Sequence, residues 1–307
     1  MRIGTRGSPL ALAQSGHVAG LLGIDSPAEL ITITTSGDLP GRDTTPGDAP
    51  ADKSRWVDTI EAALLAGEID LAVHSAKDVP GELAEGLALL GAPARAAAED
   101  VLCGVDRLEL LPEGACVGTS SVRRAAQLRA AREDLRLVRI GGNVDTRLRR
   151  LDEDALDAIV LACAGLQRLG REEQVGAVLD PVCFVPAPGQ GALALEGRVG
   201  DGVVEQAVRA ITDADTFACL RAERAVASAL NASCHTPLGA HAVPPGCGCL
   251  NLRAWVGLPD GSAWISDELL GGFYDPEDLG RRVAERMLVA GAGELLRRAE
   301  EMAVEHA

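Results

Sequence analysis

Aromatic residues make up only 2% of the 307 residues, so aliphatic side chains and alanine must fill most of any core. Hydrophobic residues still amount to 47%, so a sizeable core can be buried, and the length of 307 residues is enough for two or three domains. The sequence lacks an apolar run of about 18 residues, the length that a membrane-spanning helix needs. It begins with strand-like residues 2–5 rather than with a signal peptide. We therefore expect a cytoplasmic protein with no membrane partner.

None of the eight cysteines forms a Cys-x-x-Cys pair. Scattered cysteines in a chain of this length indicate reduced thiols rather than a disulfide framework. Zinc-compatible side chains occur at Cys234, His235, His241, Cys247 and Cys249, but their spacing matches no common zinc finger. We predict no metal site, and Cys247-Gly-Cys249 receives no role.

The chain has no excess of positive charge. Its net charge is −16, which argues against nucleic acid as a partner. The charge is unevenly distributed. Residues 117–150 contain nine arginines against three acids, a local net of +6 that leaves −22 for the rest. A basic focus on an acidic protein suits a small polyanion held in a cleft.

The centre of this basic segment is a predicted strand at 115–118 followed directly by a predicted helix at 122–131. Thr119, Ser120 and Ser121 lie between them and are candidate helix caps. Free backbone N–H groups at such a helix start bind anions. Arg123 and Arg124 in the first turn oppose the helix dipole, which indicates an anionic ligand. The alternative is a solvated arginine pair on an ordinary helix.

Strands and helices alternate through the first two thirds of the chain, which predicts mainly parallel sheets with functional residues at the carboxyl ends of the strands. The other strands are expected at 2–5, 30–35, 69–74, 101–105, 135–140, 158–162 and 192–196, and the other helices at 9–22, 56–66, 144–151 and 165–170. Residues 36–53 are rich in Gly, Pro, Asp and Thr and are expected to form a lid, while 186–191 have the composition of a hinge.

The last part differs, with a long helix at 213–230, strands near 239–243, 250–256 and 263–269, and helices near 276–289 and 293–303. It is predicted to be a separate α+β domain.

Seven segments, in this order and spacing, make the chain resemble the porphobilinogen deaminase (hydroxymethylbilane synthase) family. They are Thr5-Arg-Gly-Ser-Pro-Leu-Ala11, Val73-His-Ser-Ala-Lys-Asp-Val-Pro80, Gly118-Thr-Ser-Ser-Val-Arg-Arg124, Gly142-Asn-Val-Asp-Thr-Arg-Leu148, Leu161-Ala-Cys-Ala-Gly-Leu-Gln-Arg-Leu-Gly170, Pro188-Gly-Gln-Gly-Ala192 and Ser233-Cys-His-Thr-Pro-Leu-Gly239. Each motif is modest alone, but the ordered set is highly specific.

The resemblance implies an α/β fold with two doubly wound domains like those of periplasmic binding proteins, plus a C-terminal α+β domain. Domain 1 would comprise residues 1–95 and 190–211, domain 2 residues 99–187, and domain 3 residues 213–307. The family condenses four porphobilinogens head to tail on a covalent dipyrromethane cofactor, releases ammonia each time, and hydrolyses off the linear tetrapyrrole. We expect a monomer.

By resemblance, Cys234 forms the thioether to dipyrromethane, and Asp78 is the main catalytic acid. One fixed carboxylate can protonate the leaving amine and stabilise each cation that forms in turn. From the residues alone, Asp78 could instead cap a helix before Pro80. The acetate and propionate groups of the cofactor and chain would be bound by Arg6, Ser8, Lys53, Ser75, Lys77, Thr119, Ser120, Ser121, Arg123, Arg124, Arg147 and Arg168. Taken singly, each arginine could be a solvated surface charge.

Three departures from the family pattern bear on activity. Gly141 replaces the arginine before Gly-Asn-Val, although Arg139 could substitute at a displaced position. Residues 52–56 replace a Gly-Gly-Lys-Gly-Leu-Phe run, and Ala97-Ala-Glu-Asp100 replaces Asp-Pro-Arg-Asp. The alternative function is a divergent paralogue that binds pyrroles or anions with slow, altered or no polymerisation. A ligand-binding regulator is disfavoured, because no DNA-binding helix pair or basic arm is present in the sequence.

Overall fold

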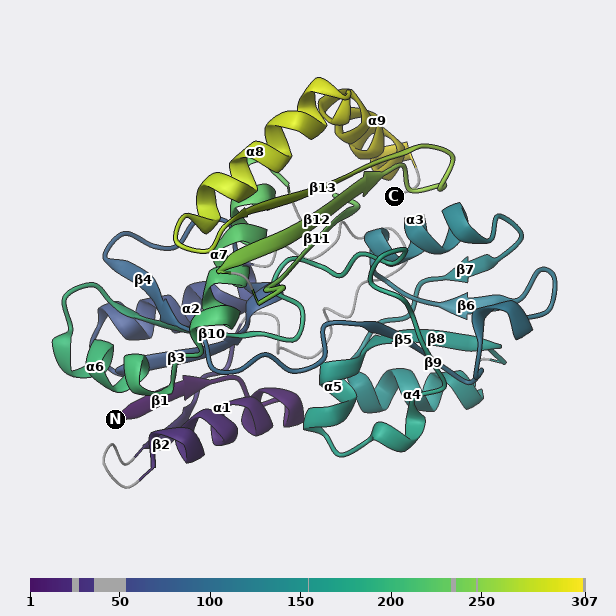
Figure 1. Ribbon diagram of the computed structural model, residues 1–307. Helices are drawn as coiled ribbons and strands as arrows, with labels where there is room; N and C mark the ends of the chain where they lie inside the picture. Colours follow the sequence, from purple (N-terminus) through teal and green to yellow (C-terminus); the bar gives the residue numbers. More distant parts are fainter. Residues whose placement is uncertain (24–27, 36–53, 154, 233–235, 247, 306–307) are drawn as a thin grey trace.

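The computed structural model describes residues 1–23, 28–35, 54–153, 155–232, 236–246 and 248–305. Figure 1 shows two five-stranded sheets side by side, with a three-stranded sheet and its helices above them. The expected division into two α/β parts and a C-terminal α+β part is confirmed. Lys53, Cys234, the whole of the expected lid at 36–53 and part of the zinc-compatible set lie outside the described residues.

The first sheet has the strand order β2-β1-β3-β10-β4. Its strands are β1 (Arg2–Thr5), β2 (Glu29–Thr32), β3 (Leu71–Ser75), β4 (Leu87–Gly91) and β10 (Leu193–Arg198). Its helices are α1 (Pro9–Leu22), α2 (Ser54–Leu65) and α6 (Gly202–Ile211). Aliphatic residues of α1, α6 and the strands form one core, and α2 covers a second apolar cluster that includes Ala72 of β3.

The second sheet has the order β7-β6-β8-β5-β9. Its strands are β5 (Asp100–Cys103), β6 (Cys116–Gly118), β7 (Arg136–Val138), β8 (Ala158–Ala162) and β9 (Ala177–Val178). Its helices are α3 (Val122–Ala131), α4 (Val144–Glu153) and α5 (Cys163–Arg168).

The prediction of mainly parallel sheets needs a correction, because each sheet is mixed and contains one strand that runs against the other four. In the first sheet β10 runs antiparallel to both β3 and β4, and in the second β5 runs antiparallel to β8 and β9. The registers give the reason. Leu193 pairs with Ser75, the last residue of β3, and Asp100 pairs with Ala162, the last residue of β8. Each chain crossing therefore enters its sheet at the carboxyl ends of parallel strands, so the entering strand must run back.

The third part is an antiparallel sheet of β11 (Leu238–Val243), β12 (Cys249–Gly257) and β13 (Trp264–Gly272). Its helices are α7 (Ala214–Ala229), α8 (Pro276–Val289) and α9 (Ala292–Glu305). Alternate residues of β12, such as Leu250 and Leu252, face the helices and form an aliphatic core with Val226 and Val283. On the opposite face Trp255 packs against Ala126 of α3 and so joins this part to the second sheet.

Cys249 is disulfide-bonded, which corrects the expectation of reduced thiols for this residue. The other cysteines in the described part of the chain, Cys103, Cys116, Cys163, Cys183 and Cys219, are free. Among the described helices, none combines the length and the apolar character that crossing a bilayer would require.

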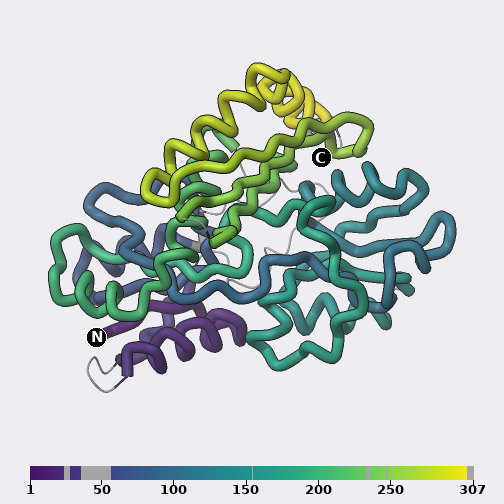
Figure 2. The backbone as a smooth tube through the Cα atoms, viewed as in Figure 1, coloured from purple at the N-terminus to yellow at the C-terminus, as the bar shows by residue number. Residues whose placement is uncertain are grey.

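One carboxylate on α7 forms hydrogen bonds to both segments that cross between the sheets, the one that contains Arg95 and the one that contains Gly189. Figure 2 shows these segments in the middle of the molecule. Glu223 is fully buried and accepts hydrogen bonds from Arg95 Nη1 at 2.6 Å and from the Gly189 N–H at 2.7 Å. It also accepts one from the Ala242 N–H of β11 at 2.8 Å. The C-terminal part is thus bonded to both crossings at one point.

Candidate active site

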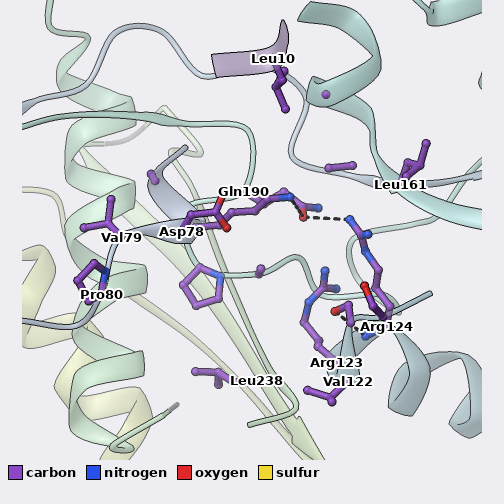
Figure 3. A pocket seen from close by; sticks show the side chains of 18 of the residues that line it. Leu10, Asp78, Val79, Pro80, Val122, Arg123, Arg124, Leu161, Gln190 and Leu238 are labelled. Carbon is purple, nitrogen blue, oxygen red and sulfur yellow. Dashed lines mark hydrogen bonds between the residues drawn. The ribbon is translucent and has the colours of Figure 1, made fainter. Parts of the chain in front are cut away.

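A cavity of about 1060 Å³ opens where the three parts meet. Its walls come from the β1–α1 loop, the turn at Ala76–Asp78, the N-termini of α3 and α4, and one face of α7. These are mostly carboxyl ends of strands and the helix starts that follow them, as the sequence predicted. Figure 3 shows Asp78 on one side of this space, with Arg123 and Arg124 reaching into it from the other.

The turn from β6 into α3 is built by small and hydroxyl residues. A Cβ at Gly118 would lie 2.9 Å from Ile140 Cδ1 and 3.0 Å from Ile159 Cγ2, so glycine lets the strand end pack closely. Ser121 caps α3 and its Oγ accepts a hydrogen bond from the Arg124 N–H at 3.4 Å. Thr119 Oγ1 accepts one from the Ser121 N–H at 3.2 Å. The predicted cap is therefore present, and it orients the two arginines.

Arg123 and Arg124 are not solvated surface charges, since they are 4% and 7% exposed. Both bind Asp100 at the start of β5. Arg123 Nη1 lies 2.7 Å from Asp100 Oδ2, and Arg124 Nη2 lies 2.7 Å from Asp100 Oδ1. Burial alone would raise the pKa of Asp100, but the two guanidinium charges outweigh it and hold this pKa well below its usual range. The trio keeps a net positive charge facing the cavity.

Gln190 connects this trio to the opposite wall. Its Nε2 donates to Asp100 Oδ1 at 2.8 Å and to the Ala98 carbonyl at 2.6 Å. Its Oε1 accepts longer hydrogen bonds, each of 3.5 Å, from Arg124 Nη2 and from Lys77 Nζ. Burial, together with the charge of Arg124, lowers the pKa of Lys77 to about 8. Lys77 is therefore a cation whose charge can be lost just above neutral pH.

Asp78 is the last residue of the turn after β3, and Ser75 occupies the capping position of that turn. Within the described parts of the chain, no donor hydrogen-bonds to the Asp78 carboxylate. The alternative that Asp78 caps a helix therefore has no support in the contacts, and its carboxylate is exposed to the cavity.

Other predicted residues complete the basic wall, and Arg6, Ser8, Ser120 and Arg147 all line the cavity. Ser8 also caps α1, because its Oγ accepts from the Ala11 N–H at 3.3 Å. Arg147 Nε donates to the Gly142 carbonyl at 2.8 Å. Burial and the neighbouring Arg124 charge lower the pKa of Arg147 to about 10.

Ser75, Thr119 and Arg168 do not belong to the described lining of the cavity. Ser75 Oγ accepts a hydrogen bond from Gln14 Nε2 at 2.7 Å, so it supports the turn from behind. Arg168 Nη2 donates to the Gly191 carbonyl of a crossing segment at 2.7 Å, and burial lowers the pKa of Arg168 to about 10. Direct contact of these three with a ligand stays a prediction.

The position of the missing family arginine lies beside the cavity. Gly142 and Asn143, which follow Gly141, line it, and Asn143 Oδ1 caps α4 by accepting from the Thr146 N–H at 2.9 Å. Arg139 is exposed and is not part of the described lining. The geometry therefore gives no support to Arg139 as a displaced substitute.

Sequence reasoning missed Asp100, Gln190, Glu223 and Arg224 as parts of the site and its frame. Gln190 lies within the predicted hinge and within one of the seven family motifs, but neither pattern assigns its side chain a contact. Glu223 was detectable, because it shares a helix face with the apolar residues Cys219, Ala222 and Val226, and a charge on such a face is a sign of a buried partner.

Comparisons with known proteins agree with this geometry. A family model described as "Porphobilinogen deaminase, dipyromethane cofactor binding domain" matches residues 1–206, and one described as "Porphobilinogen deaminase, C-terminal domain" matches residues 217–289. The porphobilinogen deaminase of Deinococcus radiodurans is 44% identical over 300 residues, covering 96% of this chain and 97% of the relative. That of Stenotrophomonas maltophilia is 46% identical over 305 residues, covering 96% and 98%.

Among solved structures, a putative methionine-binding lipoprotein of Bacillus subtilis has a TM-score of 0.41 and 10% identity, covering 69% of this chain and 89% of that one. The family models and the relatives extend over nearly the whole sequence, with the ordered motifs in place. The chain therefore belongs to the porphobilinogen deaminase family.

Proposed function

We propose that this chain works as a hydroxymethylbilane synthase, a transferase that joins four porphobilinogen molecules head to tail with release of ammonia in heme biosynthesis. The observation that supports it most directly is the pairing of an Asp78 carboxylate, exposed to the cavity, with a wall of cations in the same space. A substrate that carries carboxylates and loses an amine needs both features.

The donor set fits a dipyrromethane with acidic side chains. Arg123 Nε is buried and has no hydrogen-bond partner among the described residues, so a carboxylate that reached it would satisfy an unpaired donor. Lys77, Arg124 and Arg147 line the same cavity. When bound, dipyrromethane supplies the pyrrole to which the first substrate unit is joined. Its attachment through Cys234 rests on the family motif, since Cys234 lies outside the described residues.

Asp78 would protonate the leaving amine and stabilise the cation left on the substrate. Lys77, Ser120, Ser121, Arg123, Arg124 and Arg147 would hold the carboxylates of the primer. Arg6 and Ser8, on the β1–α1 loop, would hold those of the incoming unit. Ser75, Thr119 and Arg168 would support these groups, and Lys53 is assigned to the same ligands from the family resemblance alone.

We further propose the domain limits 1–95 with 190–211, 99–187 and 213–307, and a monomer that acts in the cytoplasm. The second candidate function is a pyrrole-binding paralogue with slow, altered or no polymerisation, and the absence of an arginine at Gly141 favours it. Retention of Asp78 with Lys77 favours the enzyme, because a simple anion binder needs no acid.

Intact mass of the purified protein tests the proposal. Wild type expressed in a host that makes porphobilinogen should carry the mass of two linked pyrroles and stain with Ehrlich-type reagent. Cys234→Ser should lack both signals, whereas Cys183→Ser, which removes an exposed free thiol, should keep them. An unmodified wild-type mass would contradict the enzyme reading.

A further inference from the structure

Beneath the turn that carries Lys77 and Asp78 lies a buried group of ionisable side chains that the proposed mechanism does not use. His74 of β3 is 7% exposed, Glu196 of β10 is 0% exposed, and Glu61 of α2 is 8% exposed. His74 pairs with Ala194 across the sheet, and Glu196 is its diagonal neighbour on the face that α2 covers. His74 Nε2 lies 2.8 Å from Glu196 Oε2.

The remaining oxygen of this carboxylate requires a proton from a neighbour. Glu196 Oε1 is buried and has no hydrogen-bond partner among the described residues. Glu61, however, is in hydrogen-bonding contact with Glu196, and burial followed by the Glu196 charge raises the pKa of Glu61. Two carboxyl groups can share a hydrogen bond only if one is protonated. A protonated Glu61 donating to Glu196 Oε1 satisfies the buried oxygen.

The same residues hold the chain on both sides of Asp78. Before it, the bond from His74 to Glu196 fixes the end of β3. After it, the Ala84 N–H donates to Glu61 Oε1 at 3.3 Å. Arg224 of α7, which the Glu196 charge attracts, donates to the Pro80 carbonyl at 2.7 Å.

We propose that Glu61, Glu196 and His74 form a positioning cluster that retains one proton and fixes the turn bearing Lys77 and Asp78. The charged groups that face it are Arg224 from α7 and Asp58 from α2. Asp58 disfavours ionisation of Glu61, and Arg224 compensates the charge on Glu196. The role in catalysis rests on the proposed function, whereas the shared proton does not.

The sign of the pH effect follows from the direction of the shift. The pKa of Glu61 is higher in the folded than in the unfolded state, so its contribution to stability is complete below the ordinary glutamate pKa of about 4.3. That contribution is lost as the pH rises through the raised pKa. Glu61→Gln replaces the O–H by an amide N–H that does not titrate.

The test measures melting temperature against pH, together with kcat and KM, for wild type, Glu61→Gln, Glu61→Ala and the control Glu68→Gln, which changes an exposed glutamate just after the same helix. The difference in melting temperature between Glu61→Gln and wild type should grow in favour of the variant as the pH rises. A melting-temperature difference that stays constant with pH would contradict the proposal that Glu61 and Glu196 share a proton.

In turnover, Glu61→Ala should lose about 10- to 100-fold in kcat through misplacement of Asp78, with a smaller change in KM. Glu61→Gln should recover most of that loss, and the control Glu68→Gln should resemble wild type. Equal losses in the Ala and Gln variants would overturn the positioning role. If the chain is not a hydroxymethylbilane synthase, the wild type and all variants will be inactive. The comparison of melting temperatures still tests whether Glu61 and Glu196 share a proton.

Discussion

Replacing Asp100 by Asn tests the buried negative charge between the two arginines of the site. The change keeps the shape of the side chain but removes the negative charge between Arg123 and Arg124, each 2.7 Å away. Asp100 is 1% exposed, and both arginines are buried, so water cannot replace the lost charge. Breaking a buried ion pair in this way costs about 3–5 kcal/mol.

This cost can be measured by urea unfolding. With a slope of roughly 2 kcal/mol/M, the expected loss lowers the first unfolding midpoint by about 1.5–2.5 M. Asp134→Asn is the matched control, because it removes the carboxylate of the solvent-accessible Arg132–Asp134 pair and should change the midpoint far less.

Acid provides a second check on the same variant. The pKa of Asp100 is depressed in the folded state, so its contribution is present above the unfolded aspartate pKa of about 3.9 and is lost as the pH falls towards the folded value. The gap between wild type and Asp100→Asn should therefore narrow below about pH 4. An Asp100→Asn midpoint within about 0.5 M of wild type at pH 7 would refute the reasoning.

Three further predictions concern activity. Asp78→Asn should keep the fold and lose about 10²-fold or more in turnover, and near-normal activity with a reduced melting temperature would instead support a structural role. Gly141 is not among the described glycines with positive φ, unlike Gly142 at φ 95°, so Gly141→Arg should fold. The added arginine should tighten substrate binding by about 1.5–3 kcal/mol, roughly 10- to 150-fold, with faster tetrapyrrole formation and fewer enzyme–pyrrole intermediates by native mass spectrometry. A wild type that already turns over fast, without intermediates, would remove the basis for this expectation. Because Lys77 has a pKa of about 8, KM for the anionic substrate should rise above that pH in wild type but not in Lys77→Arg, and parallel profiles would contradict the assignment.

Much of the site was predictable because the residues that form it are close together in the sequence. The Gly-Thr-Ser-Ser turn, its cap and the arginines after it lie within a few residues, and the chemistry of a helix start acts over that range. The ordered motifs predicted the family. The alternation of strands and helices along the chain predicted most elements, with ends within a few residues of those in the structure. The helix at Val122–Ala131 and the strand at Ala158–Ala162 begin and end where predicted.

The missed features depend on contacts between distant segments. Asp100 meets Arg123 only because β5 runs antiparallel to β8, a register that no local pattern specifies. Similarly, Glu61 and Glu196 are 135 positions apart in the sequence and meet through the packing of α2 on β10. The short strand β4 was missed because an apolar segment of this length without alternation does not distinguish strand from helix or loop.

The position of β10 has a consequence for the order of folding during synthesis. β10 lies between β3 and β4, yet Leu193 is made 102 residues after Gly91. At about 5–20 residues per second the ribosome needs roughly 5–20 s for that stretch. Until then β3 and β4 lack β10, the strand that pairs with both of them, and each has an unpaired edge. The second sheet, whose strands all lie between residues 100 and 178, can close meanwhile. Residues 1–91 therefore form an incomplete sheet, with β3 unpaired on one edge and β4 unpaired on both, until β10 has been synthesised after the whole second sheet.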